Sequence, residues 1–276
     1  MEFLPKDRLF LVVKIQCADP EQYESAKILL PVLGKRYEHG SKILTLLFPA
    51  SNVDSILTRF CRAFPRAPIV ETGLTASPGA AEYSRRITDH ISIASPGPDV
   101  APHEGQILIR SSLSFGSGFH PTTELSIKLL EQAFFIRDIQ KVFDLGTGSG
   151  ILALTAARLG AKNILATDID FQACQEAREN IALNNAGHRI SVLCGSYSCA
   201  RQGAFDLVLA NLTISTFITI GHYLPPLLKP GGLLVVSGFT PEQSPSVLSV
   251  LHHTELVNRS SLEGWAGLLL KALPSG

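Results

Sequence analysis

A glycine-rich turn is the strongest chemical signal in the sequence. Residues 144–150 read Asp-Leu-Gly-Thr-Gly-Ser-Gly, directly after a predicted strand and directly before a predicted helix. Glycines let the backbone turn sharply and approach a ligand closely, and a helix N-terminus offers free N–H groups. We therefore predict that Gly146 and Gly148 hold a nucleotide-like ligand, although an ordinary turn can have the same composition.

The acid that precedes this turn narrows the choice of ligand. The spacing is G-x-G-x-G and not the G-x-G-x-x-G of dinucleotide-binding proteins. Asp144 lies two residues before the first glycine, where a carboxylate is badly placed for a pyrophosphate but suits an ammonium or sulfonium group. The turn thus favours S-adenosylmethionine over NAD, and an NAD-dependent oxidoreductase with a Rossmann-like fold stays open as an alternative of another class.

A second acid, Asp168, ends the next predicted strand, about 20 residues beyond the glycine turn. In this architecture a carboxylate at that place accepts hydrogen bonds from both hydroxyls of a ribose. The alternative is that Asp168 only caps the helix that starts at Phe171. Asp170 is the better candidate for that cap.

Two further segments carry polar or aromatic groups that can act at the same site. Asn211 ends the predicted strand 205–211, where its amide can accept from an amine nucleophile or contact the cofactor, or can cap the following helix. Phe115 stands in a loop with two glycines between two aromatics, which can fold over a ligand or be an ordinary loop. His120 and the following Pro121 begin a helix, and we expect His120 to cap it.

Seven predicted strands position these groups, and amphipathic helices separate most of them. The strands are 141–145, 163–167, 190–194, 205–211, 232–237, 254–260 and 265–272; the helices between them are 150–159, 171–185, 214–228 and 241–251. This alternation predicts an α/β fold, a doubly wound, mainly parallel seven-stranded sheet with helices on both faces. In such a fold the ligand lies at the carboxyl ends of the strands, at the switch point.

The first third of the chain has a different pattern. Strands at 7–16 and 42–48 alternate with helical segments at 20–30 and 52–64, which predicts a small N-terminal α+β domain over residues 1–75. Residues 76–104 are rich in Pro, Gly, Ser and Ala and are predicted to be a linker, interrupted by a short strand at 90–94. The catalytic domain is expected over 105–276.

Composition excludes several classes of protein. The 24 Lys and Arg balance the 24 Asp and Glu, so nothing draws the chain to nucleic acid, and no apolar run is long enough to span a membrane. Five cysteines without C-x-x-C spacing indicate reduced, mostly buried thiols and no metal site. The first residues do not resemble a secretory signal, so we expect a cytoplasmic monomer.

Several motifs follow one another in the order of a known family: FGSGFHPTTE, DLGTGSGILALTAARLGA, ATDID, LVLANL, LKPGGLLVVSG and EGWAGLLLKA. Together they resemble PrmA, a class I S-adenosylmethionine-dependent methyltransferase family that acts on a ribosomal protein of the large subunit. The resemblance covers about residues 105–276.

This resemblance implies the class I fold and specific site residues. Thr123, Gly146, Asp168 and Asn211 match the family's cofactor contacts, and Phe115 matches its lid aromatic. The implied reaction is methylation of lysine side chains or an N-terminal amine of a ribosomal protein. A different protein or a small-molecule amine as acceptor, and a non-enzymatic binding module, are the alternatives.

Overall fold

The computed structural model describes residues 10–23, 25–38, 42–49, 53–75, 84–94, 96, 105–110 and 120–274. The chain forms two compact units. The N-terminal unit comprises Met1–Arg86, Ser92–Val100 and Ser111–Leu113, and the C-terminal unit comprises Ile87–Ile91, Ala101–Arg110 and Ser114–Gly276.

The N-terminal unit is built on a four-stranded antiparallel sheet in the order β2-β3-β1-β4. Its elements are β1 (Phe10–Gln16), a 3-10 helix (Pro20–Tyr23), α1 (Ala26–Leu29), β2 (Gly34–Glu38), β3 (Ile43–Pro49), α2 (Val53–Ala63) and β4 (Ile69–Thr75). Alternate residues of β1, such as Leu11 and Val13, pack with Phe48 of β3 and Phe60 of α2 in one core. The small α+β arrangement is therefore present.

Two of its four strands were not predicted from the sequence. β2 and β4 form the edges of this sheet, each paired with one neighbour. The residues of β2, Gly-Lys-Arg-Tyr-Glu, include three charged side chains. Edge strands often carry charges, which removes the apolar alternation by which a strand is recognised.

The segment predicted as a linker contains regular structure where it is described. β5 (Ser84–Arg86) pairs antiparallel with β6 (Ser92–Ala94), which is the short strand predicted at 90–94. β7 (Gln106–Leu108) follows in the C-terminal unit.

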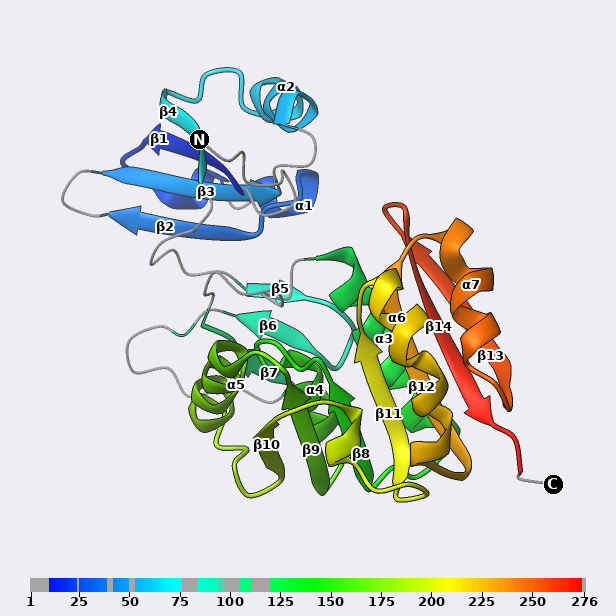
Figure 1. Ribbon diagram of the computed structural model, residues 1–276. Coiled ribbons are helices and arrows are strands. Elements are labelled where there is room, and N and C mark those ends of the chain that lie inside the picture. Colours follow the sequence, from blue (N-terminus) through cyan, green and yellow to red (C-terminus); the bar gives the residue numbers. More distant parts are fainter. Residues whose placement is uncertain are drawn as a thin grey trace. The chain divides into compact units, whose positions relative to one another are not determined.

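The C-terminal unit contains a seven-stranded sheet in the order β10-β9-β8-β11-β12-β14-β13, which confirms the predicted doubly wound α/β class (Figure 1). The first five strands in this order are parallel, and β14 and β13 are antiparallel to their neighbours. The strands are β8 (Lys141–Leu145), β9 (Asn163–Asp168), β10 (Ile190–Cys194), β11 (Phe205–Asn211), β12 (Leu228–Phe239), β13 (Thr254–Leu262) and β14 (Trp265–Ala272). β8 and β11 are neighbours at the switch point.

Helices cover both faces of this sheet (Figure 1). They are α3 (Pro121–Ile136), α4 (Ile151–Arg158), α5 (Phe171–Leu183), α6 (Ile214–Ile220) and α7 (Ser244–Val250). Phe217 of α6 and Val247 of α7 share one core with Phe143 of β8. On the opposite face α3 approaches β14 so closely that a Cβ at Gly267 would lie 2.8 Å from Leu129 Cδ1.

The predicted helix 214–228 is wrong in its second half. α6 ends at Ile220, and two short 3-10 helices, Gly221–Tyr223 and Pro225–Leu227, follow it. Pro225 and Pro226 lack the backbone N–H that a continuous α-helix needs.

Two buried asparagines, Asn180 of α5 and Asn184 at its C-cap, hold the chain segment before residue 111. Asn184 accepts from the Leu108 amide (2.9 Å) and donates to the Leu108 carbonyl (2.7 Å), as a neighbouring strand would. Asn180 accepts from the Arg110 amide (2.9 Å) and donates to the Ser149 carbonyl (2.9 Å). These contacts fasten residues 108–110 to α5 and to the glycine turn.

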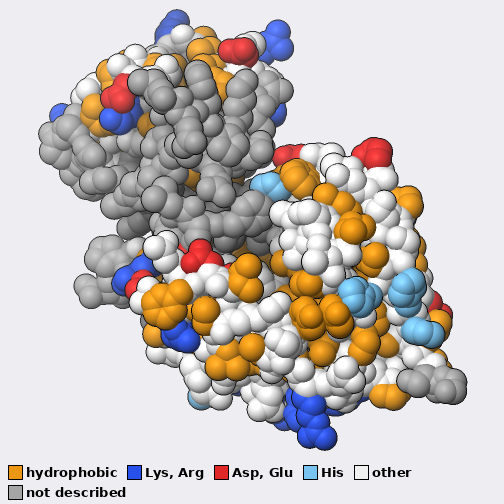
Figure 2. Space-filling view, in the orientation of Figure 1, with side chains coloured by type: hydrophobic (Ala, Val, Ile, Leu, Met, Phe, Trp, Pro, Cys, Tyr) orange, Lys and Arg blue, Asp and Glu red, His pale blue; other side chains and the backbone are white. Residues whose placement is uncertain are grey.

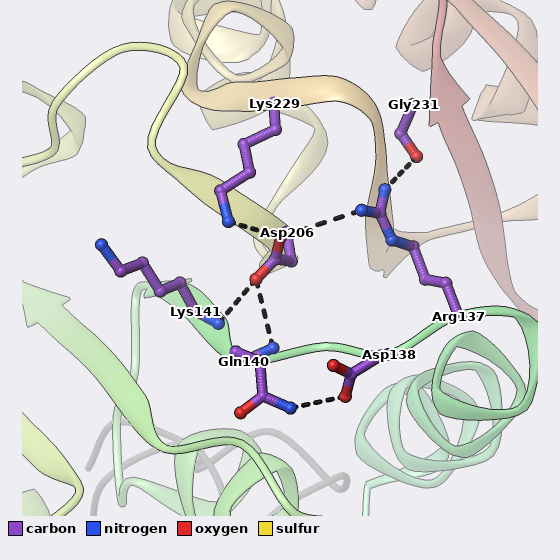
Figure 3. A network of polar contacts seen from close by, with 7 residues as sticks. All are labelled: Arg137, Asp138, Gln140, Lys141, Asp206, Lys229 and Gly231. Atoms are coloured by element: carbon purple, nitrogen blue, oxygen red, sulfur yellow. Dashed lines mark hydrogen bonds and ion pairs between the residues drawn. The ribbon is translucent and has the colours of Figure 1, made fainter.

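A buried acid organises the opposite end of the sheet (Figure 3). Asp206 accepts from Lys229 Nζ (2.6 Å) and from the amides of Lys141 (2.8 Å) and Gln140 (3.1 Å). Burial by itself would raise the pKa of Asp206, but these hydrogen bonds lower it overall. The network ties the starts of β8, β11 and β12 together.

The described positive side chains on the visible surface do not gather in one patch, in keeping with the balanced charge of the chain. On the face shown in Figure 2, the described lysines and arginines are scattered among uncharged and hydrophobic atoms. Among the described helices, none is long and apolar enough to cross a membrane.

Candidate functional site

The glycine turn lies between β8 and α4 and is held by the end of β9. The amides of Gly146 (2.8 Å) and Thr147 (2.9 Å) donate to the Thr167 carbonyl, and the Gly148 amide donates to Asp168 Oδ2 (3.0 Å). Gly150 is the N-cap residue of α4. The predicted turn and the predicted acid at the end of β9 therefore meet, as the sequence led us to expect.

Two glycines of the turn are required by conformation and by space. Gly146 has φ +71°, and a Cβ there would lie 2.5 Å from Leu212 Cδ2. Gly150 has φ +83°, and a Cβ there would lie 3.3 Å from the Ala177 Cα. A larger residue would be strained at either position because both φ values are positive, and at Gly150 it would also press against the main chain of α5.

Asp144 is buried below the turn, with 1% of its surface exposed. Thr147 donates a hydrogen bond to its Oδ2 (2.6 Å), and its Oδ1 has no partner among the residues that the structure describes. Burial raises the pKa of Asp144 to about 7, although the Thr147 bond acts in the opposite direction. A cationic group placed beside this carboxyl would favour its ionised form.

Asp170, and not Asp168, caps the helix after β9. Asp170 is the N-cap of α5 and accepts from the Gln172 amide (2.8 Å), as predicted. Asp168 accepts from the amides of Gly148 and Asp170 (each 3.0 Å), so both of its oxygens are oriented by the main chain. Each carboxylate oxygen can accept a second hydrogen bond, and the half-buried Asp168 is free to offer two acceptors to a diol.

Asn211 does not cap the following helix. Thr213 is the N-cap of α6 and accepts from the Thr216 amide. Asn211 instead donates from Nδ2 to Thr122 Oγ1 (3.2 Å), which joins the end of β11 to the first turn of α3. Its Oδ1 is buried and has no partner within the described part of the chain, so the amide presents an acceptor there.

Unpaired buried oxygens collect on the elements of this site. Among the described residues, five buried side-chain oxygens lack a hydrogen-bond partner; they belong to Thr123, Asp144, Thr167, Asn211 and Ser244. All but Ser244 lie at the carboxyl ends of β8, β9 and β11 or in the first turn of α3. Because unpaired buried polar atoms are uncommon in folded proteins, this concentration favours a polar ligand here.

The remaining predicted residues are placed as follows. His120 is the N-cap of α3, and its Nδ1 accepts from the Thr122 amide (3.3 Å), as predicted. Phe115 lies outside the described residues. Thr122, Leu212 and Asn180 were not singled out from the sequence, although a polar residue on an otherwise apolar helix face is a usable signal for Asn180.

Known proteins resemble this chain most clearly over its C-terminal two thirds. The family model described as "Ribosomal protein L11 methyltransferase (PrmA)" matches residues 83–272 and so begins before residue 105, where the resemblance of motifs starts. A ribosomal protein L11 methyltransferase of Bradyrhizobium diazoefficiens is 36% identical over 178 residues, 62% of this chain and 60% of that protein. One from Listeria monocytogenes is 34% identical over 191 residues, 67% of this chain and 60% of that protein.

A solved structure agrees with these relatives. The chain is similar to the crystal structure of ribosomal protein L11 methylase from Lactobacillus delbrueckii subsp. bulgaricus, with 30% sequence identity and a TM-score of 0.62. The match covers 69% of this chain and 99% of the solved one. The matched region thus spans about 60% of the length of the curated relatives. Since the family model covers more than half of the sequence, the chain belongs to the PrmA family of ribosomal protein L11 methyltransferases.

Proposed function

We propose that this protein is an S-adenosylmethionine-dependent N-methyltransferase that acts on ribosomal protein L11. One observation carries the proposal: the acids, the amide and the glycine turn converge at the switch point, and four buried oxygens there are unpaired. The family match supports the reaction class, and relatives named as methyltransferases argue against a nicotinamide-dependent oxidoreductase.

The residues present fit this cofactor. Asp168 would accept from the ribose hydroxyls, and Gly146 and Gly148 would let the main chain approach the ligand. Asp144 would face the cationic end of the cofactor, and Thr123 would supply a further polar contact from α3. When bound, S-adenosylmethionine would supply a methyl group attached to a sulfonium sulfur. That sulfur is a good leaving group because it departs as a neutral thioether.

The chain itself then has to align an unprotonated amine and exclude water. Asn211 is suited to the first task because Thr122 holds its Nδ2, so that its Oδ1 points to one place as an acceptor for an amine N–H. We assign Phe115 to covering the site. No general base is needed, since solvent can take the proton after transfer.

We assign substrate choice to the N-terminal unit. This assignment is supported by the family match, which begins at residue 83, after the four-stranded sheet of this unit, so that the sheet lies outside the part of the chain that matches the methyltransferase family. A substrate that is part of the ribosome also implies that the reaction takes place in the cytoplasm.

The test is methyl transfer from labelled S-adenosylmethionine to purified ribosomal protein L11, followed by mass spectrometry of the product. We expect label on lysine side chains or the N-terminal amine, and much slower transfer by Asn211→Ala. Asn163→Ala is the matched control, because Asn163 is exposed at the opposite end of β9. Cofactor binding without any methylation of L11 would mean that the acceptor is a different amine.

A further inference from the structure

Three of the five cysteines lie near the carboxyl ends of β9 and β10, beside Asp168. Cys174 is fully buried in the first turn of α5, whereas Cys194, the last residue of β10, and Cys199 are exposed. With Cys61 also exposed, the expectation that most cysteines are buried is wrong. An exposed thiol therefore lies next to a buried one.

The two sulfurs face the same stretch of main chain. Cys174 Sγ donates to the carbonyls of Asp168 (3.4 Å) and Leu193 (3.6 Å), and Cys194 Sγ donates to the Ile169 carbonyl (3.8 Å). Cys194 is also the register partner of Asp168 across the parallel pair. Burial, followed by the neighbouring Cys194 thiol, raises the pKa of Cys174.

We propose that Cys174 and Cys194 form an oxidation site: a peroxide oxidises Cys194, Cys174 converts the product to a disulfide, and the cross-link weakens cofactor binding at Asp168. The effect on the cofactor rests on the proposed function. The formation of the disulfide does not.

The chemistry balances with the peroxide as the oxidant. The exposed Cys194 sulfur attacks one peroxide oxygen, so that an S–O bond forms and the O–O bond breaks, and the leaving hydroxide takes up the proton of the Cys194 thiol and departs as water. The Cys174 thiol then loses its proton as its sulfur attacks the sulfenic sulfur of Cys194, so that the S–S bond forms and the S–O bond breaks, and the leaving hydroxide takes up that proton and departs as the second water. The two thiols give up two electrons in total, and hydrogen peroxide is reduced to two waters.

The position of the pair explains why a cross-link would reach the cofactor. The Asp168 carbonyl accepts from both the Cys174 thiol and the Gly195 amide (2.8 Å), and the Asp168 carboxylate holds the Gly148 amide. A disulfide removes the S–H donor and ties α5 to the end of β10. Either change shifts Asp168 and, through it, the glycine turn.

The experiment treats the full chain with hydrogen peroxide, alkylates the remaining thiols and maps linked peptides by mass spectrometry. We expect a Cys174–Cys194 disulfide that is absent from Cys194→Ser. In Cys174→Ser, Cys194 should stay as the sulfenic acid, which a dimedone probe labels. Cys61→Ser is the matched control, because Cys61 is an exposed thiol of α2 in the N-terminal unit.

A second measurement compares reduced and cross-linked protein for binding of S-adenosylhomocysteine. We expect about three- to tenfold weaker binding after oxidation, reversed by dithiothreitol. A Cys194–Cys199 linkage, no more oxidation at Cys194 than at Cys61, or equal affinities would each overturn this inference. Reduced protein that binds no S-adenosylhomocysteine would instead contradict the proposed function.

Discussion

Replacing Asp144 by Asn should separate the stability of the protein from its affinity for the cofactor. The pKa of Asp144 is about 7 in the folded chain and has an ordinary value of 3.8. Because the folded value is raised, the neutral carboxyl of Asp144 contributes fully to the free energy of unfolding below pH 4. This contribution declines as the pH rises to 7 and is lost above that. At about 1.4 kcal/mol per pH unit, the loss amounts to about 4 kcal/mol at most.

Asn cannot ionise and can still accept from Thr147. Above pH 7, Asp144→Asn should therefore unfold at a higher denaturant concentration than the wild type, and the difference should shrink toward pH 4. If the Asn variant is less stable than the wild type at pH 8, the buried charge of Asp144 does not lower the free energy of unfolding, contrary to this prediction.

The affinity of the wild type for the cofactor should rise with pH, whereas its stability falls. If the cationic end of the cofactor requires ionised Asp144, about a tenth of the protein is competent at pH 6 and about nine tenths at pH 8. Calorimetry should then give a dissociation constant that falls about tenfold between these pH values for the wild type, with release of protons on binding.

The Asn variant controls for titration of the ligand itself. It should bind more weakly at pH 8 and lose most of this pH dependence. An identical pH dependence in both proteins would refute the assignment of Asp144 to the cationic group.

Other substitutions test the remaining contacts. Asp168→Ala should weaken cofactor binding by about 1.5 to 3 kcal/mol in calorimetry. Asp170→Ala removes a helix cap, so it should lower stability by about 1 kcal/mol and leave cofactor affinity unchanged. If Asp168→Ala binds the cofactor as tightly as the wild type, Asp168 has only a structural role. Asn211→Ala should lower single-turnover methylation more than it lowers cofactor affinity, and a lower melting temperature with an unchanged rate would contradict this. Asp206→Asn should lower the free energy of unfolding by about 1 to 3 kcal/mol at pH 7. Because the pKa of Asp206 is lowered by its partners, its contribution is present above pH 4 and is lost below it, so the wild type and variant should converge in acid denaturation. A fragment that begins near residue 100 should bind cofactor without methylating L11; equal methylation would place recognition in the C-terminal unit.

Sequence was sufficient where local pattern and chain order decide the structure. Strand 141–145, the glycine turn and the helix after it occur as predicted, because an apolar run, glycines and a helix start are local signals. The caps at His120 and Asp170 were predictable for the same reason. The convergence of Asp144, Asp168 and Asn211 followed from the rule for parallel sheets.

Contacts between distant parts of the chain were not accessible in this way. Thr122 and Asn211 are 89 residues apart, and their hydrogen bond depends on how α3 packs against β11. The raised pKa of Asp144 depends on burial by the whole unit and not on its neighbours in sequence. The exposed position of Cys194 likewise depends on the strand order, which places β10 at the edge of the sheet.

Asn180 and Asn184 also decide where a fragment of the C-terminal unit can begin. Their carboxamides serve Leu108 and Arg110, which precede the strands of the main sheet. A fragment that starts at residue 111 would lack the amides that donate to the Oδ1 atoms of these asparagines, at about 1 to 3 kcal/mol for each group left unsatisfied. A fragment that starts at Gly105 keeps these hydrogen bonds. A difference of six residues at the N-terminus should therefore separate a fragment that folds from one that aggregates.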